Sequence, residues 1–210
     1  MKRICRKISV ALFLLQTAAI YAQIRPDALV EYRKGNYEAA VLICKDELAA
    51  NPNSLESHVV MCWSLIQLNR YEEARTYALA GRNISRYDIR IVEILGEVSY
   101  YQGRNAESLQ YFQEYINLAP EGGRLDTVYY FLGEIYIRLG RFRHADIALS
   151  MAVHYMPGNA AWWVRLAYAQ ESAGYLQDAV RAYEQALVLN AHLPDARRGL
   201  DRVRQSLGNR

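Results

Sequence analysis

The chain has 210 residues, of which 52% are hydrophobic and 22% are charged, with 25 Lys and Arg residues against 22 Asp and Glu residues. Four of the basic residues lie within the first seven positions, and without them the formal net charge falls from +3 to −1. A nearly neutral chain lacks the basic stripe that neutralises phosphates, so the composition argues against nucleic-acid binding. The length is sufficient for one continuous hydrophobic core.

Residues 1–22 have the pattern of a secretory signal peptide. Four basic residues precede an apolar run of about fourteen residues that begins at Ile8, whereas a membrane span needs roughly twenty. We therefore expect cleavage after Ala22 and no stable membrane span in the mature chain. The alternatives are an uncleaved signal that anchors the protein in the membrane and an ordinary amphipathic first helix. No Cys stands directly after the run, where a lipoprotein would carry its lipid. The sequence therefore predicts a periplasmic or secreted bacterial protein.

The clearest structural unit runs from Leu125 to Pro157. Two stripes of apolar residues recur there at helical spacing, and they are carried by Leu132, Tyr136, Leu139, Phe142, Ala145, Leu149 and Ala152. Gly140 separates the stripes, because a residue without Cβ can adopt the left-handed conformation that ends a helix. Pro157 ends the second stripe because it lacks an amide donor. The unit is therefore predicted to be a helical hairpin, whose apolar faces need stacked copies to be buried.

The hairpin recurs along the chain with a fixed period. Its turn residue falls at Gly35, Asn69, Gly103, Gly140 and Gly174, which are 34, 34, 37 and 34 residues apart. Small residues stand seven positions before each turn, at Ala28, Cys62, Gly96, Gly133 and Ala167. Mostly aromatic residues stand two positions after it, at Tyr37, Tyr71, Asn105, Phe142 and Leu176. Small residues return five positions after it, at Ala40, Ala74, Ser108, Ala145 and Ala179.

These columns, with Pro52, Pro120 and Pro157 after three of the units, resemble the tetratricopeptide repeat. The resemblance implies an all-α, right-handed superhelical solenoid of about five hairpins, over residues 24–53, 55–87, 89–122, 126–158 and 160–193. The first hairpin diverges most, because acidic residues replace apolar or small ones there at Asp27, Glu31 and Glu47. Residues 194–208 have one apolar and one charged side, which predicts a C-terminal capping helix.

The longer spacing of 37 residues arises around Glu121–Arg124, where two adjacent glycines lengthen the turn between the third and fourth hairpins. Two interpretations stay open for this segment. It is either a tolerated loop insertion or a flexible joint between two halves of the solenoid.

The resemblance also implies where binding occurs, since first helices line the concave groove of such solenoids. When the residues expected in the core are set aside, the other side of each first helix carries mainly aromatic and acidic residues. Tyr and Trp are enriched at binding hot spots. We expect a Lys or Arg of the ligand, or Arg138, to lie near Glu93, Glu97 or Glu134. The alternative is that the tyrosines only fill gaps between helices. The predicted groove residues are Val59, Trp63, Ile66, Glu93, Glu97, Tyr100, Tyr101, Tyr130, Glu134, Ile137, Arg138, Val164, Tyr168 and Glu171.

Members of the family that clamp a terminal carboxylate use Lys and Asn in this stripe. Here Val59, Glu93, Tyr130 and Val164 stand at the Lys column, so we do not expect that mode of binding.

Cys44 and Cys62 lie on neighbouring predicted helices. In an oxidising compartment they could form a disulfide if their Cα atoms lie within about 7 Å. The alternative is a pair of buried free thiols that act as small apolar residues. The four His residues are scattered and no CxxC or HExxH motif occurs, so we expect no metal site and no cofactor.

Three classes of function follow from these features. The favoured one is a non-catalytic scaffold that binds a peptide or helix of a cell-envelope or exported protein in the concave groove. The second is a structural subunit whose repeat edge stacks on another chain, and a homo-oligomer is compatible with it. The third is an enzyme, in which Glu97 and Glu134 would act as the two carboxyl groups of an inverting glycosidase.

Overall fold

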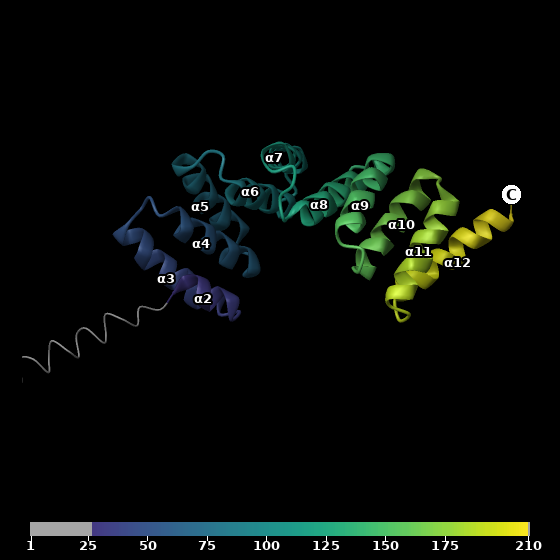
Figure 1. Ribbon diagram of the computed structural model, residues 1–210, viewed down its shortest axis with the longest axis horizontal. Coiled ribbons are helices and arrows are strands. Elements are labelled where there is room, and N and C mark those ends of the chain that lie inside the picture. Colours follow the sequence, from purple (N-terminus) through teal and green to yellow (C-terminus); the bar gives the residue numbers. More distant parts are fainter. Residues whose placement is uncertain (1–26, 210) are drawn as a thin grey trace, which may run out of the picture. The chain divides into compact units, whose positions relative to one another are not determined.

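The computed structural model describes residues 27–209, and within this range all regular elements are α-helices (Figure 1). The predicted signal peptide lies outside the described residues. The helices are α2 (Ala28–Arg33), α3 (Tyr37–Ala50), α4 (Leu55–Gln67), α5 (Tyr71–Ile84), α6 (Ile89–Tyr101), α7 (Asn105–Leu118), α8 (Leu125–Arg138), α9 (Phe142–Tyr155), α10 (Ala160–Ala173), α11 (Leu176–Leu189) and α12 (Pro194–Gly208). The predicted all-α fold of repeated helical hairpins is therefore confirmed.

The turn residues predicted from the sequence have the left-handed backbone conformation. The φ angles are 82° at Gly35, 72° at Gly103, 68° at Gly140 and 85° at Gly174. Asn69 is the one non-glycine residue with positive φ in residues 27–209, at 58°, and Asn tolerates this region better than most residues. The second helix of each hairpin begins two residues later, so these turns determine the register of the whole chain.

Small residues allow the two helices of a hairpin to approach closely. A Cβ atom at Gly96 would lie 2.6 Å from the Phe112 ring, and one at Gly133 would overlap Leu149. On the facing second helices, the column of small residues is fully buried at Ala40, Ala74, Ser108, Ala145 and Ala179. The predicted core columns are therefore the contacts that hold each hairpin together.

The chain divides into two compact units, one ending at Tyr77 and one beginning at Ala78. The first contains α2, α3, α4 and the start of α5. The second contains the remaining helices, in which α6 packs on α7, α8 on α9 and α10 on α11. Its first helices also contact each other in order, α6 with α8 and α8 with α10.

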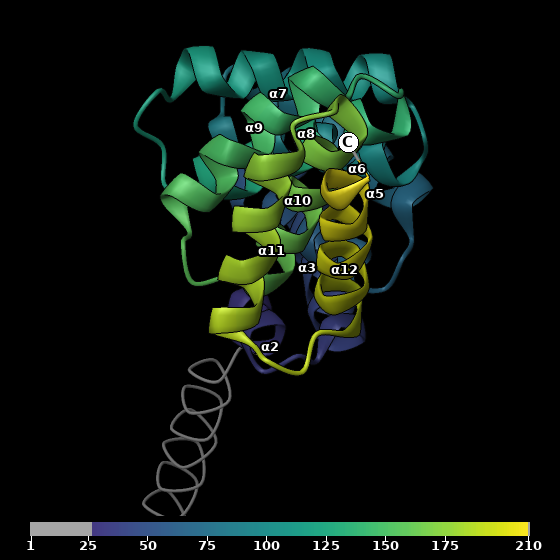
Figure 2. The same ribbon diagram turned by 90° about the vertical axis from the view of Figure 1, so that its right-hand side faces the viewer.

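Helix α12 packs against both α11 and α10, so it occupies the place of one more first helix (Figure 2). Its buried side carries Ala196, Leu200 and Val203, whereas its arginines are exposed. This arrangement covers the apolar surface of the last hairpin.

The Glu121–Arg124 turn lies inside the second unit. A Cβ atom at Gly122 would lie 2.7 Å from the Tyr115 hydroxyl oxygen and 2.9 Å from the Ala119 side chain, so the turn is packed closely against α7 and the residue after it. The division between the units falls instead within α5. The loop insertion and the flexible joint both stay predictions for this turn.

Candidate protein-binding surface

Three first helices of the second unit share one partly exposed surface, called here the first-helix face. It carries six predicted residues together with two that the prediction missed, Trp162 and Arg165. The members are Tyr100 and Tyr101 of α6, Tyr130, Glu134 and Arg138 of α8, and Trp162, Arg165 and Tyr168 of α10. Aromatic rings and paired charges connect them from one helix to the next.

Aromatic contacts cross the boundaries between hairpins. The ring of Tyr130 stacks on Trp162, with 4.9 Å between centroids and an interplanar angle of 11°. The ring of Tyr100 lies 4.9 Å from that of Phe131, and Tyr101 packs edge-on against both. Tyr101 remains 43% exposed, so part of the cluster is open to a ligand.

Arginines lie over two of the rings, one from the next hairpin and one from the same helix. The guanidinium of Arg138 lies 4.3 Å from the Tyr100 ring centroid and donates to the Tyr100 carbonyl oxygen at 3.1 Å. It also donates to Asn105 Oδ1 at 3.0 Å. Arg165 lies 5.5 Å from the centroid of the Tyr168 ring. The rings are therefore fixed before any ligand binds.

The acidic residues of the predicted groove are mostly paired. Arg124 donates to Glu93 at 2.8 Å, Arg165 to Glu134 at 2.6 and 2.9 Å, and Arg202 to Glu171 at 2.5 and 2.7 Å. In each pair the Arg follows the Glu by 31 residues, and the Glu side chains are only 6%, 12% and 17% exposed. The expectation that Glu93 and Glu134 are available to a cationic ligand is wrong, because Arg124 of the following turn and Arg165 of the following hairpin already supply the cation. Arg138 does not neutralise them either, since it contacts Tyr100.

Glu97 differs from these three residues, because no ion pair or hydrogen bond of its carboxyl group is found in residues 27–209. Burial, and then the charge of Glu93, raise the pKa of Glu97 to about 7, against the opposing effect of Arg124. Burial also raises the pKa of Glu93, although Arg124 lowers it. Glu97 is therefore the predicted groove carboxyl that a ligand cation could still pair with.

Comparison with known proteins agrees with this architecture. The tetratricopeptide-repeat family model matches residues 126–153. The crystal structure of PilW, described as a widely conserved type IV pilus biogenesis factor, has a TM-score of 0.74 at 21% identity, over 87% of this chain and 83% of PilW. The chain has the tetratricopeptide-repeat fold.

Two further structures with this fold are similar. The crystal structure of MamA protein has a TM-score of 0.67 at 21% identity, over 84% of this chain and 93% of MamA. YrrB, described as a tetratricopeptide-repeat protein with an unusual peptide-binding site, has a TM-score of 0.65 at 14% identity, over 80% of this chain and 86% of YrrB. No curated protein sequence matches the chain significantly.

In the compact unit that ends at Tyr77, two predicted groove residues of the second hairpin are in the core. Val59 is fully buried and Ile66 is 6% exposed, so neither contributes to an open surface. The reason is that nine of the thirteen residues of α4 are buried, which leaves little of the helix for a groove. Trp63 is partly buried, with its ring centroid 5.7 Å from that of Tyr32.

The remaining predicted residues lie towards the C-terminal end of the repeats. Ile137 and Val164 are partly buried against the hydrophobic core of the last hairpins. Tyr168 is 37% exposed and contacts Phe142 edge-on. Glu171 accepts hydrogen bonds from both Arg202 and the Tyr183 hydroxyl group, so it is a structural contact between α10, α11 and α12.

Arg124 and Arg165 were not among the predicted groove residues, although both contact the stripe. The signal that could have identified them is the recurrence of Arg 31 residues after an acidic residue of the stripe. Helical periodicity within one repeat does not reveal this spacing, because it connects successive repeats. Trp162 had no comparable signal, since Trp163 beside it is equally aromatic.

Cys44 and Cys62 are buried free thiols, and Cys62 donates a weak hydrogen bond to the Ala74 carbonyl oxygen at 3.4 Å. Burial raises the pKa of Cys44 to about 12 and also raises that of Cys62. Among residues 27–209, no cluster of three or more His, Cys, Asp or Glu side chains has the arrangement needed to hold a metal ion. No helix in the same range has both the length and the apolarity needed to cross a bilayer.

Proposed function

We propose that this chain is a non-catalytic scaffold whose first-helix face binds a segment of another protein. The observation that carries the proposal is the row of partly exposed rings at Tyr101, Tyr130, Trp162 and Tyr168, on successive first helices. Aromatic side chains supply large contact areas at low entropic cost. Arg165 already lies over one of these rings, that of Tyr168. The likeness to YrrB, which is described as having a peptide-binding site, supports a peptide ligand.

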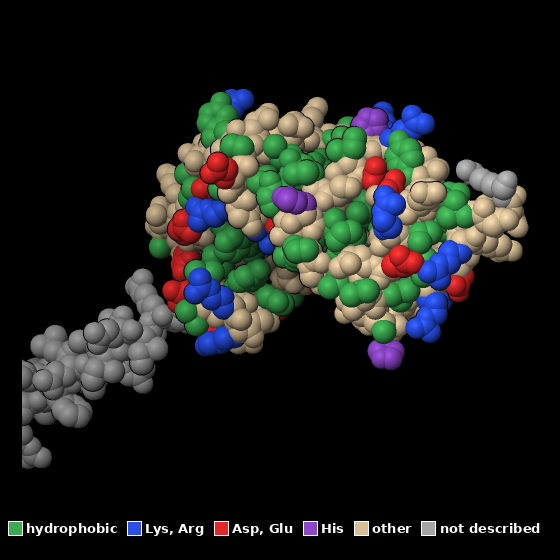
Figure 3. Space-filling model, turned by 45° about the vertical axis from the view of Figure 1, so that its right-hand side comes forward, with side chains coloured by type: hydrophobic (Ala, Val, Ile, Leu, Met, Phe, Trp, Pro, Cys, Tyr) green, Lys and Arg blue, Asp and Glu red, His purple; other side chains and the backbone are tan. Residues whose placement is uncertain are grey.

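The charges on this face suggest what the ligand carries. Because Glu93 and Glu134 are neutralised within the protein, they offer a ligand no unpaired charge. On the side of the molecule in view in Figure 3, acidic and basic side chains lie next to one another and form no field of a single sign. The ligand therefore binds mainly through apolar and aromatic side chains, with Glu97 available to one Lys or Arg.

The N-terminal signal pattern supports export, so the proposed partner is a periplasmic, envelope or secreted protein. Mass spectrometry of the protein purified from its host tests this part separately. A mature chain beginning at Gln23 is the expected result, and a chain that retains residues 1–22 in the membrane fraction would contradict it.

A pair of matched variants tests the binding surface. Tyr101→Ala with Tyr168→Ala removes two exposed rings of the first-helix face. Tyr87→Ala with Tyr175→Ala removes two rings that are 62% and 38% exposed and lie outside it. The wild type and both variants are used to capture proteins from the host envelope fraction, after circular dichroism has shown equal helicity.

We expect a partner that the wild type and the Tyr87/Tyr175 variant retain and the Tyr101/Tyr168 variant loses. Equal capture by the two variants would place binding elsewhere on the molecule and refute the proposed surface.

A further inference from the structure

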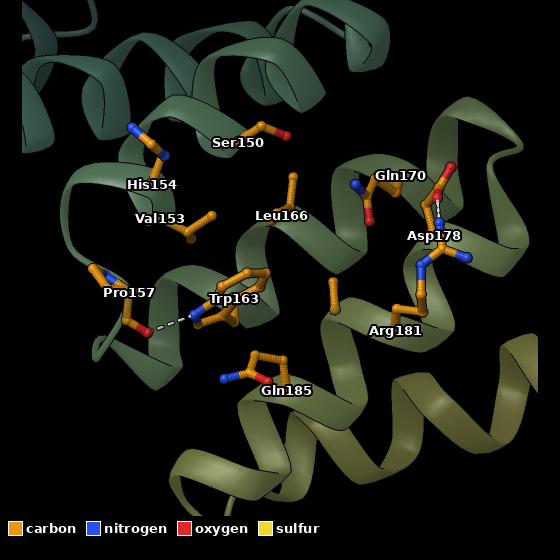
Figure 4. A pocket seen from close by; sticks show the side chains of 11 residues that line it. Ser150, Val153, His154, Pro157, Trp163, Leu166, Gln170, Asp178, Arg181 and Gln185 are labelled. Atoms are coloured by element: carbon orange, nitrogen blue, oxygen red, sulfur yellow. Dashed lines mark hydrogen bonds and ion pairs between the residues drawn. The ribbon is translucent and has the colours of Figure 1, made fainter.

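A pocket of about 650 Å³ lies between α9, α10 and α11, on a side of α10 that the first-helix face does not include (Figure 4). Its apolar wall is formed by Val153, Leu166, Ala182 and the Trp163 ring, and Gln170 and Gln185 supply amide groups. The volume lies within the range of about 300–1,000 Å³ that is usual for ligand sites. All of these residues belong to the unit that begins at Ala78.

Two adjacent tryptophans separate this pocket from the first-helix face. Trp162 stacks on Tyr130, whereas Trp163 lines the pocket. The Trp163 indole N–H donates to the Pro157 carbonyl oxygen at 2.8 Å, which fixes the ring in the wall, as Figure 4 shows. The ring therefore offers its apolar surface to a ligand and keeps its donor occupied.

Most polar groups around the pocket are occupied by other protein groups. Asp178 and Arg181 form an ion pair with each other, and Ser150 Oγ lies 3.5 Å from Asp146 Oδ1. Gln170 Nε2 donates to the same Asp146 oxygen at 2.9 Å, which determines the orientation of the Gln170 amide. Gln170 Oε1 is buried and has no hydrogen-bond partner in residues 27–209. Buried acceptors in folded proteins are generally hydrogen-bonded, so we expect a ligand to supply the donor.

The occupied groups restrict the chemistry of the ligand. The charges of Asp178 and Arg181 cancel, so a charged ligand would find no unpaired counter-charge there. A sugar needs hydrogen-bonding partners over most of its surface, and the apolar wall of the pocket supplies none. A peptide segment with an apolar side chain needs only a few such partners, because its polar groups are the backbone amides.

The length of the pocket also agrees with a peptide. Asp178 and Gln185 line it on α11 and are seven residues apart, which corresponds to about 10 Å along a helix. An extended chain advances about 3.3 Å per residue, so about three residues match this length.

We propose that this pocket binds an extended, uncharged segment of about three residues of a partner protein. An apolar side chain of the segment packs on Trp163, Val153 and Leu166, and one of its backbone N–H groups donates to Gln170 Oε1. This site goes beyond the first-helix face and does not depend on it.

Fluorine NMR of the full chain labelled with 5-fluorotryptophan tests the proposal, because the chain has three tryptophans and each gives its own signal. The signals are assigned with single Trp→Phe variants. The probes are synthetic peptides selected from a random heptapeptide phage library on the immobilised wild-type chain. We expect uncharged peptides with an apolar residue to shift the Trp163 signal and leave the Trp162 signal in place.

Three variants sharpen the test. Gln170→Met removes the free acceptor and is expected to weaken binding by about tenfold, the effect of losing one hydrogen bond. Gln185→Arg places a long charged side chain at the pocket and is expected to weaken binding even where Gln170→Met fails to fold. Tyr87→Ala, at a ring that is 62% exposed and lies outside both sites, is expected to leave the affinity unchanged.

Several outcomes would overturn the proposal. They are the failure to select any peptide, selection of charged peptides, shifts confined to Trp162, or unchanged affinity in both glutamine variants. A shift of Trp163 by maltose or chitobiose but by no peptide would reassign the pocket to a sugar. A result at Trp162 reports on the first-helix face separately, so the two proposals can fail independently.

Discussion

The two sides of α10 differ in how their polar groups are satisfied. On the first-helix face, Arg165 reaches back to Glu134 of the preceding repeat and Trp162 stacks on Tyr130. On the pocket side, Asp178 pairs with Arg181 within the neighbouring helix α11, and Gln170 Oε1 has no partner in residues 27–209. Contacts between repeats therefore neutralise the charges of the first-helix face. On the pocket side, a contact with Asp146 of the preceding repeat holds the Gln170 amide and leaves its Oε1 without a partner.

Two ion pairs between a carboxylate and a guanidinium need not stabilise the folded protein equally. The Glu134 side chain is 12% exposed, whereas Asp178 and Arg181 are 46% and 68% exposed. Water screens the second pair and weakens it, while the first is partly shielded and connects two hairpins. Substitutions around α10 test this comparison, and one at Glu97 of α6 tests the effect of burial on a carboxyl group without a partner.

The largest effect is expected from Leu166→Ala, because Leu166 is 3% exposed and supports both sides of α10. Truncating a buried Leu to Ala costs about 2 to 5 kcal/mol of unfolding free energy, depending on how far the cavity collapses. Urea unfolding followed by circular dichroism measures the loss. The matched control is Ile147→Ala on α9, where the side chain is 67% exposed and we expect a change within about 0.5 kcal/mol. Equal losses in the two variants would show that α10 is not part of the core.

The next effect is a pH-dependent stabilisation by Glu97→Gln. The folded-state pKa of about 7 lies above the usual value of 4.5, so the folded chain binds this proton more tightly than the unfolded chain. The stability that protonated Glu97 provides is therefore complete below about pH 4.5 and is lost as the pH rises through about 7. The Gln side chain does not titrate, so the variant does not lose this stability as the pH rises.

We expect Glu97→Gln to be more stable than the wild type by about 1 to 3 kcal/mol at pH 8 and nearly equal to it at pH 4.5. Urea unfolding of both proteins at several pH values gives the difference. A difference that stays constant with pH would mean that Glu97 keeps an ordinary pKa in the folded protein.

The smallest effects separate the two ion pairs. In Arg165→Met, the Glu134 carboxylate remains shielded from water but loses the guanidinium that neutralises it. We expect this change to cost about 1 to 2 kcal/mol of unfolding free energy. Arg181→Met breaks the exposed pair and is expected to cost at most about 0.5 kcal/mol. Adding Glu134→Gln to Arg165→Met removes the unpaired charge and should restore part of the loss. If the two single variants lose equal stability, shielding does not distinguish the pairs.

Much of the repeat architecture could be predicted from the sequence. Gly140 and Phe142 mark the turn and the start of α9, and Gly133 and Ala145 mark the close contact between helices. These features are local, because they depend on backbone conformation and on spacing within one or two turns of helix. The candidate site could be predicted only in part. Tyr101, Tyr130 and Tyr168 have partly exposed rings, but Val59 and Ile66 are in the core.

By itself, the sequence determined the 34-residue period, the left-handed turns and the small residues at helix contacts, since each depends on residues close together in the chain. Only the tertiary structure decided which charges are paired and which of Trp162 and Trp163 faces the pocket. The physical reason is that these outcomes depend on side chains about 30 residues away, such as Arg165 reaching Glu134. Helical periodicity predicts on which side of its own helix a residue lies. It does not predict which side chains of the neighbouring helix contact that residue.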